Sequence, residues 1–208
     1  MLTLTDAFAM LGVALALYAA GVRVLTKRTA VFTPSIAQVL GSALVLTVLL
    51  VPSRGDVSIT AYVRGFSSDL SITLVVLAVW SLLNKFGCSQ PMYDRELKAL
   101  MVPIAAAALV LYPTALGWGD WDAYRLGWGS WGFLFTLLAL CALCFIQGLR
   151  VLPALVALAL LAWSFGLMES GNLWDYLMDP WLSAYALVFV CLKFWQSARR
   201  RFVNRRSL

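Results

Sequence analysis

The residues best suited to chemistry lie in a tryptophan-dense segment between two apolar runs, Leu116–Trp131, with the sequence LGWGDWDAYRLGWGSW. Its opening LGWGDW returns ten residues later as LGWGSW. Carboxylates and a guanidinium alternate here with aromatic rings, and flat apolar faces beside hydrogen-bonding groups suit a sugar ring or a lipid headgroup. The candidate contact residues are Trp121, Asp122, Tyr124 and Arg125.

A second segment, Glu169–Trp181, has similar chemistry in the sequence ESGNLWDYLMDPW. Its WDY is similar to the WDAY of the first segment. We therefore expect the two segments to form one face, and we count Trp174, Asp175 and Tyr176 among the candidate contact residues. Glycines at positions 117, 119, 127, 129 and 132 predict tight turns that fold the first segment into a compact cap.

Carboxylates can also bind a divalent cation or act as general acid and base. The spacing here lacks the D-x-[DN]-x-[DN]-G run of a calcium loop. The chain contains no histidine, which excludes histidine-ligated metal sites and Ser-His triads. Cys141 and Cys144 lie in the apolar stretch ALCALCFI, which indicates reduced packing residues. We therefore predict no metal, no cofactor and no catalytic residue.

A third candidate stretch, Arg64–Ile72, has the sequence RGFSSDLSI and leads into an apolar run. We expect Asp69 to cap the following helix by accepting backbone N–H bonds. Arg64 is close enough in sequence to pair with Asp69, and both residues are candidate binding groups.

Gly65, Asp69, Leu70 and Ser71 of this stretch form a G-x-x-x-D-L-S pattern. The pattern resembles the start of a transmembrane helix in membrane-anchored sulfatase-superfamily transferases of the lipoteichoic-acid-synthase and phosphoethanolamine-transferase type. Those enzymes move a phospho-headgroup from a lipid donor at the outer face, using a large soluble domain with a metal-bound Thr nucleophile. No such domain occurs in these 208 residues. The resemblance therefore implies similarity to the membrane part alone and carries over no catalytic residue.

Composition indicates a membrane protein, because 62% of the residues are apolar and 12% are charged. Soluble domains average roughly 45–50% and about 25%. The apolar residues gather in runs typical of bilayer spans. The runs are 7–25, 34–51, 70–83 (66–86 at full extent), 99–116, 131–149, 151–167 and 181–195. We predict an all-α, polytopic membrane helix bundle of about seven transmembrane helices over residues 1–196, in which Gly12, Ala16 and Ala20 allow close helix approach within one chain or between two.

Charge predicts the orientation of this bundle. With the N-terminus outside, the cytoplasmic segments hold thirteen Lys and Arg residues, and the outer segments hold Arg54, Arg64 and Arg125. Among the acids, only Asp94 and Glu96 then fall inside. We therefore predict an N-out, C-in arrangement with outer caps at 52–69, 117–130 and 168–180. The basic tail at 197–208 suits anionic lipid in the cytoplasmic leaflet, and we expect no nucleic-acid partner.

No ionisable residue falls near the middle of a run, which argues against a pump or transporter, because such residues mark ion and proton paths. We expect a non-catalytic bacterial inner-membrane protein of cell-envelope biogenesis. It would be an accessory or scaffold subunit that binds membrane lipids and a membrane or periplasmic protein partner, or a lipid or glycan substrate, at its outer face. Two alternatives stay open. One is a small integral-membrane enzyme acting on a lipid-linked substrate, with Asp69, Asp122 or Asp175 as base or metal ligand; the other is a channel or transporter.

Overall fold

The computed structural model describes residues 3–25, 36–51 and 58–206, with side chains described outside 36–39 and 200–206. Within these residues every regular element is a helix, so the prediction of an all-α chain is confirmed. The elements, in chain order, are α1 (Leu4–Leu25), α2 (Ile36–Leu50), α3 (Ile59–Ser67), α4 (Ile72–Lys85), α5 (Asp94–Ala115), the 3-10 helix η1 (Ala123–Gly127), α6 (Trp131–Ile146), α7 (Val151–Ser164), α8 (Leu173–Leu177) and α9 (Pro180–Arg206).

Seven of these helices overlap the seven apolar runs: α1, α2, α4, α5, α6, α7 and α9. Among the described residues, only α1 and α5, with 22 residues each, are long and apolar enough to cross a membrane by length and composition. At 1.5 Å per residue, the 14 residues of α4 or α7 reach about 21 Å, against a hydrocarbon core of about 30 Å. The lengths and compositions of the helices therefore support two membrane spans, and the bundle of seven spans stays a prediction.

Parts of the sequence prediction lie outside the described residues. They include the start of the second run at Pro34, the beginning of the first outer cap at 52–57, and the last residues of the basic tail, 207–208. Lys27, Arg28, Arg54 and Asp56, which entered the charge comparison, are also outside them.

The described helices belong to two compact units. Unit 1 comprises residues 1–92 and 155–177, and unit 2 comprises residues 93–154 and 178–208. This division was not predicted from the sequence. Each unit is described below by itself.

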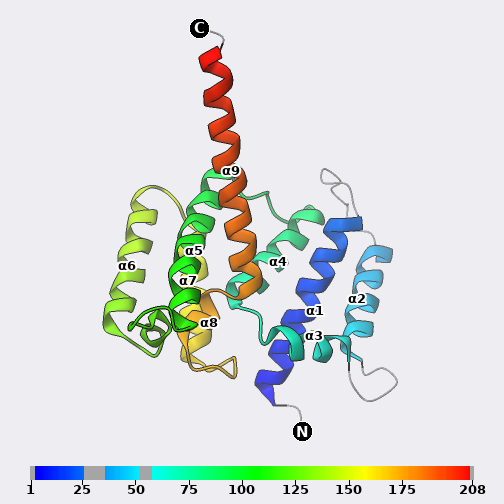
Figure 1. Ribbon diagram of the computed structural model, residues 1–208. Helices are drawn as coiled ribbons and strands as arrows, with labels where there is room; N and C mark the ends of the chain where they lie inside the picture. Colours follow the sequence, from blue (N-terminus) through cyan, green and yellow to red (C-terminus); the bar gives the residue numbers. More distant parts are fainter. Residues whose placement is uncertain (1–2, 26–35, 52–57, 207–208) are drawn as a thin grey trace. The chain divides into compact units, whose positions relative to one another are not determined.

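In unit 1, α1 packs against α4, α3 and α2 (Figure 1). Ala19, Ala78 and Leu82 form a small buried core between α1 and α4, with Ala16 packed beside them. Gly12 lies against Val75 of α4, where an added Cβ would approach Val75 Cγ2 to 3.0 Å. The close helix approach predicted at Gly12 therefore occurs within one chain.

The third run differs from its prediction. Instead of one helix over 66–86, the chain forms a short α3, a turn, and then α4 from Ile72. Ser68 ends α3 at φ 59°, in the left-handed region that non-glycine residues rarely adopt. Ser71 caps α4 by accepting a hydrogen bond from Leu74 N at 3.1 Å. The prediction that Asp69 caps this helix is therefore wrong.

In unit 2, α5 and α9 pack along each other, and α9 extends past the start of α5 towards the C-terminus (Figure 1). Tyr112 and Ser183 share a 3.2 Å hydrogen bond near the end of α5. Lys193 Nζ donates to Asp94 Oδ1 at 2.6 Å near its start. The two helices are therefore antiparallel. The basic tail at 197–208 does not form a separate segment up to Arg206, because α9 continues through it.

Polar side chains at the start of α5 hold the connection between α6 and α7. Glu96 accepts backbone N–H bonds from Arg150 at 2.9 Å and Val151 at 3.2 Å, which caps the beginning of α7. Arg95 Nη2 donates to the carbonyl of Gln147 at the end of α6, at 3.0 Å. Only residues 147–150 separate the two helices.

Candidate functional site

Four charged side chains of unit 1 meet at one point, and we call them the Arg64 clasp: Arg64, Asp6, Asp69 and Glu169. Arg64 Nη1 donates to Asp6 Oδ1 at 2.6 Å, and Arg64 Nε donates to Asp69 Oδ1 at 2.6 Å. Arg64 Nη2 donates to Glu169 Oε1 at 2.7 Å. Every nitrogen of the guanidinium thus has a carboxylate partner. One cation faces three anions, so the clasp keeps a net negative charge.

Local structure presents each carboxylate to Arg64. Thr3 and Asp6 form a capping box at the start of α1, in which Asp6 Oδ2 accepts from Thr3 N at 3.0 Å and Thr3 Oγ1 accepts from Asp6 N at 3.2 Å. This leaves Asp6 Oδ1 for the clasp. Ser68, at φ 59°, ends α3 between Arg64 and Asp69 and donates its backbone N–H to the carbonyl of Arg64. Glu169 lies in the segment that follows α7. The clasp therefore joins segments more than a hundred residues apart.

The carboxylates also fix the charge of the guanidinium. The hydrogen bond to Asp6 raises the pKa of Arg64 most strongly, and the bonds to Asp69 and Glu169 raise it further, while burial acts against them. Arg64 and Asp69 are mostly buried, whereas Glu169 is exposed. Arg64 therefore stays charged over the whole range in which proteins are folded, and the pairing predicted between Arg64 and Asp69 is confirmed.

The segment around α8 is held by its own hydrogen bonds. Tyr176 is fully buried, and its hydroxyl accepts from Met168 N at 3.1 Å. Asp175 accepts from the hydroxyl of Ser170. Trp174 and Asp175 are half-buried. Tyr176 thus supports the chain from inside, which leaves Trp174 and Asp175 as the accessible members of this predicted contact set.

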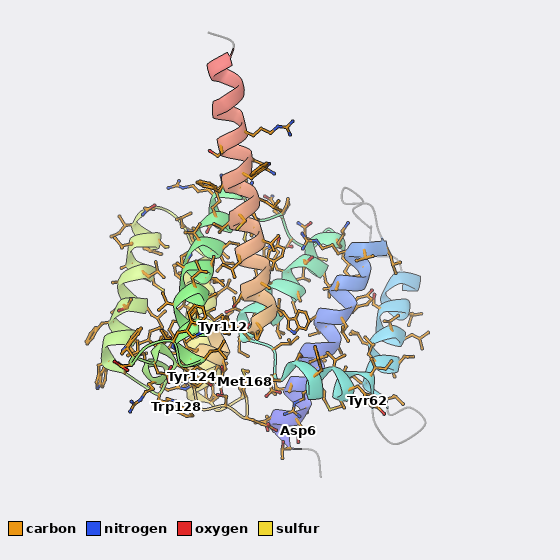
Figure 2. The ribbon with its side chains drawn as sticks, in the orientation of Figure 1. Asp6, Tyr62, Tyr112, Tyr124, Trp128 and Met168 are labelled. Carbon is orange, nitrogen blue, oxygen red and sulfur yellow. The ribbon has the colours of Figure 1, made fainter. Side chains whose placement is uncertain are left out.

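In unit 2, residues Leu116–Trp131 form a compact element that we call the tryptophan cap. Asp122 Oδ1 accepts from Tyr124 N at 2.9 Å and so caps η1. Thr114 Oγ1 accepts from Ala123 N at 3.2 Å, which fastens the cap to the end of α5. Figure 2 shows Tyr124 and Trp128 in this cap. The predicted compact cap is therefore present, with Asp122 in a structural position.

The glycines of the cap behave as predicted only in part. Gly117, Gly119 and Gly129 have φ values of 89°, 92° and 88° and make the turns. Gly127 ends η1, and Gly132 lies in the first turn of α6. The two LGWG repeats thus differ in conformation at their first glycine.

Large side chains of the cap face outwards. Arg125 is exposed, and so are the tryptophans Trp118, Trp121, Trp128 and Trp131. Such a set can cover a lipid headgroup, a sugar or an apolar protein surface through its rings while Arg125 pairs with an anion. Trp121, Asp122, Tyr124 and Arg125 therefore form one group within unit 2. Arg64, Asp69, Trp174, Asp175 and Tyr176 all belong to unit 1. That both sets share one face stays a prediction.

The part of the chain that the structure describes contains no group of three or more His, Cys, Asp or Glu residues that could hold a metal ion. All four cysteines are free thiols.

Sequence reasoning missed Asp6 and Glu169 as partners of Arg64. The T-x-x-D pattern at Thr3–Asp6 signals the cap of α1, but nothing in the sequence links Glu169 to Arg64.

No protein-family model, curated protein or solved structure matches this chain.

Proposed function

We propose that this chain is a non-catalytic integral protein of the bacterial inner membrane, with seven spans and an N-out, C-in orientation. It serves as an accessory or scaffold subunit in cell-envelope biogenesis. Its outer face, acidic and rich in tryptophan, binds a membrane or periplasmic protein partner or a lipid or glycan substrate. The tryptophan cap provides the main contact surface.

Exposed apolar faces support membrane embedding. On α2, Leu40, Leu44 and Val48 are all exposed at four-residue spacing, which places them on one side of the helix. On α6, Phe135, Leu138 and Phe145 are exposed as well. Apolar patches of this extent are costly in water and are satisfied by a bilayer.

The contacts within each unit support the number of spans, because they join segments that a seven-span chain places on the same side. The Arg64 clasp joins four residues that the charge comparison places outside. In unit 2, Asp94 with Lys193, Arg95 with Gln147 and Glu96 with Arg150 join segments that it places inside. An error of one span would have set residues from opposite sides against each other in these pairs.

The observation that carries a binding role is the contrast between carboxylates and tryptophans. Asp122 caps η1, Asp175 binds Ser170, and Asp179 Oδ1 accepts from Leu182 N at 2.8 Å to cap α9. Of the three acids considered as base or metal ligand, Asp122 and Asp175 thus stabilise their own loops, and Asp69 is paired with Arg64. The tryptophans beside them are exposed. A surface of this kind favours recognition over bond-breaking chemistry.

The resemblance at Gly65–Ser71 indicates the class of partner that we propose. Envelope transferases of the sulfatase superfamily carry their catalytic domain outside the membrane, which is the side that the tryptophan cap faces in this orientation. Asp69 and Ser71 have local structural contacts here, in the clasp and at the α4 cap. We therefore assign this chain a supporting role beside such an enzyme.

The test is native mass spectrometry after gentle extraction from the native membrane. We expect the wild-type protein to retain a stoichiometric partner, protein or lipid, that is lost from the Trp121→Ala, Arg125→Ala double variant. Trp195→Ala is the matched control, because Trp195 is an exposed tryptophan of α9 outside the cap. Retention of the partner by the double variant would exclude the cap as the contact surface. Turnover of a lipid-linked substrate by the purified protein alone would establish the enzyme alternative instead.

A further inference from the structure

Helix α3 has an unusual division of its side chains. Three of its apolar residues, Ile59, Tyr62 and Phe66, are 44%, 64% and 84% exposed, whereas Val63 is half-buried. Their spacing of three and four residues places them on one face. The charged residue, Arg64, faces the opposite way, into the clasp. The amphipathic pattern is therefore inverted relative to a helix on a water-soluble surface.

The polar groups of α3 are also satisfied internally. Ser58 Oγ accepts from Ala61 N at 3.2 Å and lies 2.9 Å from Thr60 Oγ1. Thr60 Oγ1 reaches the carbonyl of Leu49 in the last turn of α2, at 3.4 Å. The exposed face of α3 thus carries no charged side chain, and an uncharged apolar face of this size calls for an apolar environment.

The contacts of α3 define its position relative to the ends of the neighbouring helices α1 and α2. Arg64 binds Asp6 in the first turn of α1, and α1 is one of the two helices with the length and composition of a span. Figure 2 shows Asp6 and Tyr62 at the same end of unit 1. α3 therefore lies at the level where α1 begins and α2 ends. In a bilayer crossed by α1, that level is the boundary between headgroups and acyl chains, where amphipathic aromatic residues such as tyrosine are favoured.

We propose that α3 is an interfacial helix. Its face of Ile59, Tyr62 and Phe66 is seated in the boundary layer of the outer leaflet, and the Arg64 clasp fixes it there. This inference rests on the membrane embedding of the proposed function. The occupant is lipid, because three side chains on a nine-residue helix cover far less than the roughly 800 Å² per partner of a stable protein interface. Because Arg64 lies in the clasp, the exposed face of α3 carries no charged group that would have to be dehydrated when this face enters the boundary layer.

The test is the depth of spin labels in vesicles of phosphatidylethanolamine and phosphatidylglycerol. Labels are attached to single cysteines in a variant that lacks Cys88, Cys141, Cys144 and Cys191. The test positions are Tyr62→Cys and Phe66→Cys. Leu44→Cys on the exposed face of α2 reports the hydrocarbon, and Lys98→Cys, at an exposed charged position near the start of α5, reports water contact. All four side chains are accessible, so labelling disturbs no core.

At positions 62 and 66 we expect an oxygen-to-nickel accessibility ratio several-fold above that at 98 and below that at 44. Ratios at 62 and 66 equal to that at 98, with position 44 in hydrocarbon, would overturn the interfacial helix and leave membrane embedding intact. Water contact at position 44 as well would overturn both proposals. Adding Arg64→Gln should move the label at 66 towards water, and an unchanged depth would contradict the role of the clasp.

Discussion

At the scale of single residues, Arg64 shows what sequence reasoning reaches and where it ends. Its pairing with Asp69 follows from a separation of five residues and was predicted. Its bonds to Asp6 and Glu169 span 58 and 105 residues and depend on the packing of α1, α3 and the segment after α7. Long-range partners of this kind leave no local signal. A single arginine therefore carries contacts that become visible only in the folded chain.

Replacing Arg64 by glutamine should destabilise unit 1. The change removes three charge-assisted hydrogen bonds and leaves Asp6, Asp69 and Glu169 facing one another without a cation. We expect a loss of about 1–3 kcal/mol, the range for removing one partner of a partly buried charged hydrogen bond, measured by unfolding in detergent or bicelles. Arg64→Lys should recover only part of this, because an ammonium lacks the planar fork that reaches three carboxylates.

The control for Arg64 is Arg125→Gln, which removes the same charge from an exposed position in the tryptophan cap. We expect its stability to stay within about 0.5 kcal/mol of the wild type. Equal stability of the two glutamine variants would show that the clasp contributes nothing to the fold.

At the scale of elements, apolar runs predicted which segments are helical but not where each helix begins. α5 starts at Asp94, five residues before the predicted run at Ala99, because its first turns are charged and make contacts with α6, α7 and α9. The run at 66–86 hides a break, since the left-handed Ser68 separates α3 from α4. Hydropathy averages over such breaks. The amphipathic character of α3 was missed for this reason.

Packing of α1 on α4 predicts a difference between two glycines of the same helix. A methyl group at Gly12 would meet Val75 Cγ2 at 3.0 Å, whereas one at Gly21 would meet nothing within 4 Å. Both changes to alanine gain the same helix propensity. We expect Gly12→Ala to be less stable than Gly21→Ala by about 1–3 kcal/mol, the usual cost of overpacking, in thermal unfolding of the purified protein.

A second change checks the cause of this difference. Val75→Ala removes the methyl group that the new Cβ would meet, so it should narrow the gap between the two glycine variants. If Gly12→Ala is as stable as Gly21→Ala when Val75 is present, α1 and α4 do not approach as closely as described.

At the scale of the whole molecule, composition and charge predicted a helical membrane protein. Over the residues that the structure describes, every regular element is a helix, and two of these helices have the length and composition of a span. The division into two units was beyond prediction, because each unit combines segments from both halves of the sequence. Segments 116–131 and 169–181 looked alike in composition, yet the first lies in unit 2, whereas residues 169–177 of the second lie in unit 1. Different hydrogen bonds stabilise the two segments. The similar amino-acid sequences of these two segments therefore did not specify similar structures.

The central claim is that the clasp and the tryptophan cap lie on the outer side of a membrane and the start of α5 on the inner side. It is tested most directly by labelling single cysteines with a membrane-impermeant maleimide in bacterial spheroplasts, using the variant that lacks native cysteines. We predict that Arg125→Cys and Glu169→Cys react in intact spheroplasts and that Lys98→Cys reacts only after lysis. Reaction of Lys98→Cys in intact spheroplasts, or protection of Arg125→Cys and Glu169→Cys, would contradict the account.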